Sequence, residues 1–147
     1  MTENLFWIGL AGAVIALLFA VIQSRKVLRF SEGTDLMKKL AASIRKGANA
    51  YLKRQYKAVV KIFLVVFVVL LILVATGQLD NWFIPFAFLT GGCYSALAGF
   101  IGMKIATSSN ARTAHAAHES LNRGLQVAFS SGSVMGFTVV GLGLLDI

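Results

Sequence analysis

The chain has 147 residues, of which 57% are hydrophobic and only 14% are charged. In a soluble domain about a quarter of the residues are charged, so this composition is unusual for one. It excludes a disordered chain, because such chains are polar and poor in aromatic residues. The single cysteine, Cys93, excludes a disulfide framework and a zinc site built on several cysteines. The composition therefore indicates a membrane protein.

Four stretches contain no charged residue: 5–22, 62–79, 82–103 and 124–145. Each has about the 20 apolar residues that a helix needs to cross a bilayer, and a helix satisfies its own backbone hydrogen bonds in lipid. No polar helix face remains inside these stretches, which argues against a soluble bundle. We therefore predict an all-α integral membrane protein with four transmembrane helices, at about 5–22, 59–79, 82–106 and 124–147.

The first span carries small residues four apart, at Gly12, Ala16 and Ala20. Such a stripe lets helix backbones approach closely. The span does not read as a cleavable signal peptide, because its leading charge is Glu3 and no A-x-A site follows it.

Residues 23–61 hold 11 basic side chains and two acidic ones, Glu32 and Asp35. Ser31 to Asp35 offers turn and N-cap chemistry, and the two acids are well placed to offset a helix dipole. Apolar residues then recur at helical spacing from Met37 to Gln55. We predict a basic amphipathic cytoplasmic helix at about 34–57, which can lie on anionic headgroups, dock on a partner or bind an anionic substrate.

The second span has only Val, Leu, Ile and Phe over 62–74, so we predict that it faces lipid. The third and fourth spans carry further small-residue stripes: Gly91, Ser95 and Gly99, then Gly124, Ala128, Gly132 and Gly136. We expect Gly132 and Gly136 to face another helix closely. That helix can belong to this chain, to another copy or to more of the same polypeptide.

Residues 104–123 continue the third span as a second cytoplasmic helical segment. His115, His118 and Glu119 are spaced like metal ligands, but the order H-A-A-H-E matches neither H-E-x-x-H nor H-x-x-E-H. Asp146 is a candidate functional acid beside a span, and a place among the headgroups fits it equally well. The sequence shows no Walker A, G-x-G-x-x-G or G-x-S-x-G motif, and we predict no catalytic, cofactor-binding or metal-binding residue.

All 14 basic residues fall in two of the segments that separate the spans, and the other side holds only Glu3, Asp80 and Asp146. The positive-inside rule then predicts cytoplasmic loops at 23–61 and 104–123 and non-cytoplasmic termini. The net charge of +8 reflects this topology. We expect no nucleic-acid partner, because that needs a basic soluble surface or stacking aromatics.

Two long segments resemble one known family. They are Glu32–Lys57, EGTDLMKKLAASIRKGANAYLKRQYK, and Ser95–Leu145, with the words AGFIGMKIAT, NART and GSVMG in that order. Both resemble the membrane-bound, ion-translocating inorganic pyrophosphatases, and the four spans match the opening helices of that family in number and direction.

The resemblance implies a homodimeric membrane enzyme with about sixteen spanning helices per subunit in two rings. It hydrolyses cytoplasmic Mg-pyrophosphate to pump H⁺ or Na⁺ outward, here across a bacterial plasma membrane. Members need Mg²⁺, and one subclass needs K⁺. Residues 1–147 would be a single membrane segment, the N-terminal outer-ring helices, in contact with lipid and with the remaining helices. The family's pyrophosphate and gating motifs lie on later helices, so no catalytic residue is carried over and this segment alone would be inactive.

A different interpretation is a stand-alone four-helix membrane assembly or transporter subunit with a lipid-binding basic helix. The two interpretations differ in the coding sequence downstream. Continuation into an Asp-rich stretch of the D-x-x-x-D type supports the pyrophosphatase, and a genuine stop codon with a stable product supports the small subunit.

Overall fold

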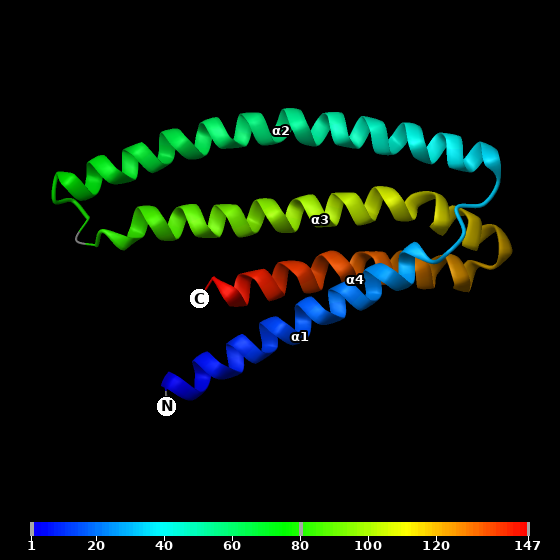
Figure 1. Cartoon of the computed structure of the whole chain (residues 1–147), viewed down its shortest axis with the longest axis horizontal. Coiled ribbons are helices and arrows are strands. Elements are labelled where there is room, and N and C mark those ends of the chain that lie inside the picture. Colours follow the sequence, from blue (N-terminus) through cyan, green and yellow to red (C-terminus); the bar gives the residue numbers. More distant parts are fainter. Residues whose placement is uncertain (1, 80, 147) are drawn as a thin grey trace.

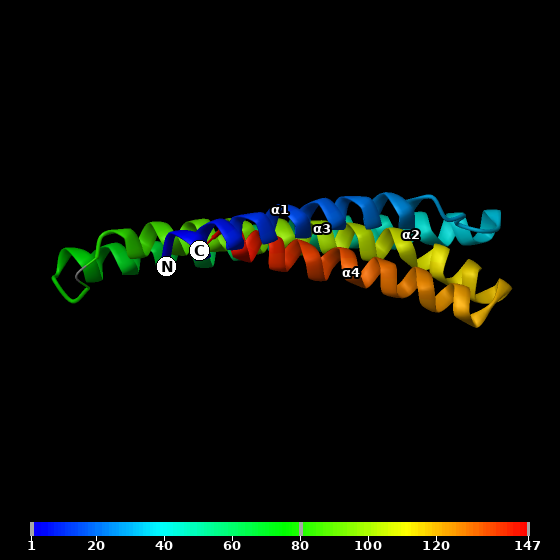
Figure 2. The ribbon, with the colours of Figure 1, turned by 90° about the horizontal axis from the view of Figure 1, so that it is seen from below.

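The structure, a computed structural model, describes residues 2–79 and 81–146. Every regular element in these residues is an α-helix: α1 (Thr2–Leu28), α2 (Asp35–Ala75), α3 (Phe83–Glu119) and α4 (Leu121–Leu145). All four helices are long and apolar enough to cross a membrane, which confirms the predicted fold class. They form an elongated, thin array (Figures 1 and 2).

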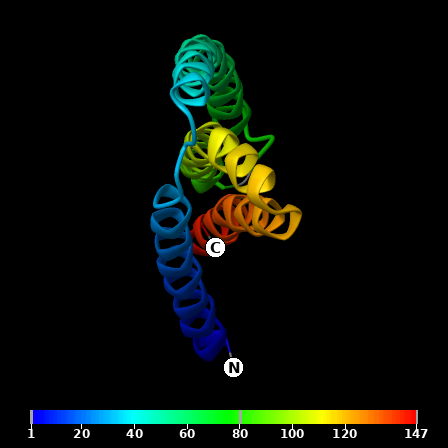
Figure 3. The ribbon, with the colours of Figure 1, turned by 90° about the vertical axis from the view of Figure 1, so that its right-hand side faces the viewer.

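Helix α3 lies in the middle of the array, between α2 on one side and α4 on the other, and α1 packs mainly on α4 (Figure 3). The core lies where α1, α3 and α4 meet, at Ala20, Ile105 and Val134. The predicted stripe of α1 is confirmed in part, because Ala16 and Ala20 are buried with Ala13. Small side chains there let α1 approach its neighbours closely.

Helix α2 is one continuous helix of 41 residues, about 60 Å long at the helical rise. The prediction of two helices, 34–57 and 59–79, is therefore wrong about a boundary near residue 58. No proline or glycine lies between Tyr51 and Thr76 to interrupt the helix. The amphipathic segment thus continues the axis of the second span and runs beside α3 (Figure 1).

Other boundaries differ from the predicted ones by a few residues. Helix α1 runs on to Leu28, α2 ends at Ala75, and α4 starts at Leu121 after a break at the extended residue Ser120. The predicted helical continuation of the third span beyond Lys104 is confirmed as far as Glu119, where α3 ends. Asp80 and Ile147, which the predicted topology and fourth span include, lie outside the described residues.

The register between helices is set by small residues. A Cβ at Gly124 would lie 2.6 Å from the Cβ of Ala117, and one at Gly91 would lie 2.9 Å from Oδ2 of Asp146. Helix α4 therefore runs beside residues 91–117 of α3. The C-terminal turns of α2 and the N-terminal turns of α3, which we call the outer turns, project as a hairpin beyond the ends of α1 and α4 (Figure 1).

The structure bears on two packing predictions. A Cβ at Gly132 or Gly136 would meet no atom within 4 Å, so neither residue faces another helix in the described part of this chain. Helix α2 is not lipid-facing all round either, because Phe63 stacks on Phe88 with ring centroids 4.7 Å apart. The sequence pattern shows which helices carry small residues, but not which face of a helix meets a neighbour.

Candidate functional site

The link between α1 and α2 has a fixed conformation at the end of the bundle where the basic residues gather. Gly33 adopts a positive φ of 84°, a conformation that side-chain-bearing residues rarely take. A Cβ there would also lie 3.0 Å from the ring of His115. Thr34 caps α2 by accepting a hydrogen bond from the Met37 amide at 3.4 Å, which confirms the predicted capping chemistry.

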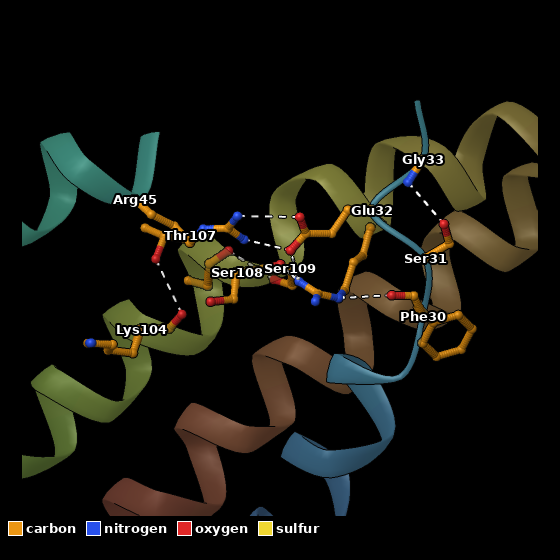
Figure 4. A network of polar contacts seen from close by, with 11 residues as sticks. Phe30, Ser31, Glu32, Gly33, Arg45, Lys104, Thr107, Ser108 and Ser109 are labelled. Atoms are coloured by element: carbon orange, nitrogen blue, oxygen red, sulfur yellow. Dashed lines mark hydrogen bonds and ion pairs between the residues drawn. The ribbon is translucent and has the colours of Figure 1, made fainter. Parts of the chain in front are cut away.

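Glu32 joins this link to two helices (Figure 4). Its Oε1 accepts a hydrogen bond from Nη1 of Arg45 on α2 at 2.6 Å, and its Oε2 one from Nη2 at 3.3 Å. Nη1 of Arg112 on α3 lies 2.9 Å from the same Oε1. We call these three residues the Glu32 cluster. The two-point contact with Arg45 is the strong, directional form of a carboxylate pair.

Arg112 makes further contacts from its place on α3. Its Nε donates to the carbonyl of Phe30 at 3.0 Å, and its Nη1 donates to the carbonyl of Ser108 one turn earlier. The side chain is 12% exposed, so its charge is largely removed from water. The guanidinium therefore holds the α1–α2 link and the C-terminal part of α3 together.

The charges of the Glu32 cluster decide its chemistry. The hydrogen bond from Arg45 lowers the pKa of the Glu32 carboxyl below its ordinary value, and the charge of Arg112 adds to this effect. The carboxylate therefore stays ionised at neutral pH and is a poor proton carrier. The Glu32 cluster therefore links the α1–α2 connection to α2 and α3, and it is not suited to acid–base chemistry.

The other acids near this end of the bundle are also paired with cations. Asp35 Oδ1 lies 3.1 Å from Nζ of Lys38, and Glu119 pairs with Arg123 and lies 3.6 Å from Nε2 of His115. In residues 2–79 and 81–146, no three His, Cys, Asp or Glu side chains gather as metal ligands. His118 is not grouped with His115 and Glu119 in these described residues. The absence of catalytic, cofactor-binding and metal-binding residues stays a prediction.

The remaining predicted residues lie in different places. Asp35 is in the first turn of α2, as predicted, whereas Glu32 is not a capping residue and belongs to its own cluster. Asp146 stands beside Gly91 at the other end of the bundle. Along the predicted amphipathic face, Ala41 and Leu52 are buried, but Leu40, Ile44 and Tyr51 are largely exposed.

The Glu32 cluster was not predicted from the sequence. One signal was present, because Arg112 is the only charged residue between Lys104 and Glu119 in an Ala/Ser/Asn-rich segment. An isolated arginine in such a helix requires an acidic or carbonyl partner when it is buried. Its partner lies 80 positions earlier in the chain, and no local periodicity shows that contact.

Comparison with known proteins gives one consistent result. The family described as "Inorganic H+ pyrophosphatase" matches residues 14–147. A Bacteroides thetaiotaomicron protein named "Putative K(+)-stimulated pyrophosphate-energized sodium pump" is 51% identical over 147 residues, which are 100% of this chain and 20% of that protein.

Two further relatives show the same pattern. A Moorella thermoacetica K⁺-insensitive pyrophosphate-energized proton pump is 42% identical over 98% of this chain and 20% of its own length. A Thermotoga maritima K⁺-stimulated pyrophosphate-energized sodium pump is 40% identical over 91% of this chain and 18% of its own length. The chain thus spans about a fifth of the length of these relatives. Its four apolar helices and the extent of the family match lead to one conclusion: the chain is an integral membrane protein that belongs to the inorganic H⁺ pyrophosphatase family.

Proposed function

We propose that residues 1–147 form the opening, outer-ring segment of a homodimeric pump in a bacterial plasma membrane. The pump couples hydrolysis of cytoplasmic Mg-pyrophosphate to outward transport of H⁺ or Na⁺. The observation that carries the proposal is the family match over residues 14–147, together with the names of the relatives. Relatives named as sodium pumps and as proton pumps both match, so their names select neither ion, and the proposal places that choice in the remaining polypeptide.

The segment is a scaffold in this proposal. Hydrolysis in a magnesium site requires several carboxylates that hold the ions and orient a water. In the described residues, the cytoplasmic acids Glu32, Asp35 and Glu119 each have a cationic partner. These residues do not fit a Mg²⁺ site, so the proposal places the Mg²⁺ and K⁺ sites in the remaining polypeptide.

The proposed topology puts the Glu32 cluster and the basic part of α2 on the cytoplasmic side. The 11 basic residues of 23–61 support this orientation. The cluster fixes the α1–α2 link against α2 and α3, which keeps these helix ends in place for the helices that follow. The exposed basic side chains of α2 attract pyrophosphate electrostatically without turning it over.

The test is phosphate release from pyrophosphate by the purified, reconstituted chain with Mg²⁺ and K⁺, beside a whole pump. We expect sustained turnover by the whole pump and none by the chain. Turnover by the chain that survives removal of contaminating phosphatases would place a hydrolytic site within these 147 residues. That result would contradict the scaffold role.

A further inference from the structure

Cavities lie on both flanks of the seam between α2 and α3, one of about 440 Å³ on the side of Met135 and two on the side of Cys93. The helices meet where the Tyr56 hydroxyl donates to the carbonyl of Ala96 and where Phe63 covers Gly92. Beside these contacts lie two cavities of about 490 and 180 Å³. Both are lined by Tyr56, Cys93 and Ala96, so they form one continuous groove, which we call the α2–α3 groove.

The two ends of this groove differ in chemistry. The end toward the outer turns is apolar and is lined by Val60, Leu64 and Leu89. The opposite end is lined by Asn49, Lys53 and Phe100, a set that combines an amide, a cation and an aromatic ring. The polar end faces the basic side of the protein.

A second cation stands at the polar end. Nζ of Lys104 lies 5.4 Å from the centre of the Phe100 ring, within the range of a cation–π contact. Phe100 itself lines the groove beside Lys53. An anionic group held at this end would therefore meet Lys53 from α2 and Lys104 from α3.

The position of the groove along the helices also suits one class of ligand. Leu64 and Leu89, at the apolar end, lie in the uncharged spans 62–79 and 82–103. Lys53 and Lys104 lie in the basic segments that flank these spans. An apolar trough with cations at its headgroup end matches a molecule with a long acyl chain and an anionic head.

We propose that the α2–α3 groove binds an anionic phospholipid of the leaflet on the basic side of the protein. An acyl chain lies along Cys93, Leu97 and Leu64, and the phosphate lies between Lys53 and Lys104. Basic residues near a membrane surface attract anionic lipid strongly enough for selection. The site rests on the membrane placement of the helices and not on pump activity.

The experiment is native mass spectrometry of the purified chain with equal amounts of phosphatidylglycerol and phosphatidylcholine. We expect the chain to retain phosphatidylglycerol preferentially. The double variant Lys53→Gln/Lys104→Gln should reduce this preference roughly 5- to 30-fold, the size expected for two lysines at a headgroup. The matched control Arg54→Gln/Lys61→Gln removes the same charge from residues that do not line the groove, and it should change the preference less than twofold.

Two further measurements complete the test. Leu97→Trp fills the groove and should reduce retention of both lipids, whereas Val65→Trp, on an exposed position of α2, should not. Inorganic phosphate at millimolar concentration should not displace the phospholipid. The proposal is overturned if wild type shows no preference, if both double variants lose it equally, or if free phosphate displaces the lipid.

Discussion

At the scale of single residues, the Glu32 cluster is the feature that the structure adds to the sequence. One carboxylate accepts hydrogen bonds from Arg45 and lies against Arg112, and its side chain is 18% exposed. Charge-assisted hydrogen bonds in such sites are stronger than those of neutral groups. Removing the carboxylate would leave two guanidinium groups close together without their shared partner.

Glu32→Gln should therefore lower the free energy of unfolding by about 1–3 kcal/mol at neutral pH. Because the pKa of Glu32 is lowered in the folded state, the stabilisation is complete above its ordinary pKa of 4.5 and is lost as the pH falls further. Thermal unfolding in detergent should show a gap between wild type and variant at pH 7 that narrows below pH 4.5.

The control is Asp35→Asn, whose side chain is 91% exposed beside Lys38. This substitution should lower the free energy of unfolding by less than about 1 kcal/mol. Equal effects of the two substitutions at neutral pH would show that the cluster contributes nothing beyond a surface ion pair.

The glycines of α4 give a second prediction at this scale. At Gly124 a new methyl group would collide with the backbone and side chain of Ala117, while at Gly132 it would meet open space. Gly124→Ala should destabilise the chain by about 1–3 kcal/mol. Gly132→Ala should stabilise it by up to about 1 kcal/mol through helix propensity. Denaturant titration of both variants checks the pair, and the reverse order would contradict the observed α3–α4 register.

At the scale of helices, the continuity of α2 is the clearest difference from the sequence-based expectation. The change from basic amphipathic to apolar composition near residue 58 predicted a break between two helices. Composition follows the boundary between water and lipid, whereas the backbone follows helix propensity and breakers, and α2 has no breaker there. The contacts of Phe63 and Phe67 with Phe88 and Phe86 further hold α2 along α3.

Ala58→Pro tests this continuity, because Ala58 is exposed and has no packing role in the described chain. A proline inside a helix costs about 3 kcal/mol or more, so we expect a large loss of stability and of helical circular dichroism. Leu36→Pro lies in the first turn, where proline is tolerated, and should have a much smaller effect. A silent Ala58→Pro would show that the helix is broken at this position.

A further prediction at the scale of helices concerns the exposed face of α4 that carries Gly132 and Gly136. In the described chain nothing lies against Gly132 and Gly136, so Gly132→Leu/Gly136→Leu should be tolerated by the 147-residue chain alone. In a whole pump, we expect the same pair to reduce the amount of assembled protein, because the stripe then meets another helix. Val65→Leu, at an exposed position of α2, is the control. Equal loss from both changes would contradict a helix-facing role for the stripe.

At the scale of the whole molecule, the sequence predicted the class of fold but not its internal register. Uncharged runs identified all four helices, since spanning lipid leaves little choice of backbone structure. The register of α3 against α4 places Ala117 beside Gly124 and Asp146 beside Gly91. This register depends on contacts between residues distant in the sequence, which no local pattern encodes. The Glu32 cluster is missing from the prediction for the same reason.

Topology is a prediction for the whole molecule. In a background of Cys93→Ser, a cysteine at position 46 should be labelled only after the membrane is permeabilised. A cysteine at position 80 should be labelled from outside intact cells. The 14-to-0 split of basic residues between the two sides is the reason. Preferential labelling of position 46 from outside would reverse the orientation.

The most direct measurement of the central proposal is an exchange of segments. The part of the Bacteroides thetaiotaomicron relative that matches this chain at 51% identity is replaced by residues 1–147, and pyrophosphate hydrolysis and pyrophosphate-driven ion uptake are measured in vesicles. If this chain is the opening scaffold of such a pump, the hybrid should hydrolyse and transport at rates near those of the relative. A hybrid that reaches the membrane in normal amount but neither hydrolyses pyrophosphate nor moves ions would contradict the proposal.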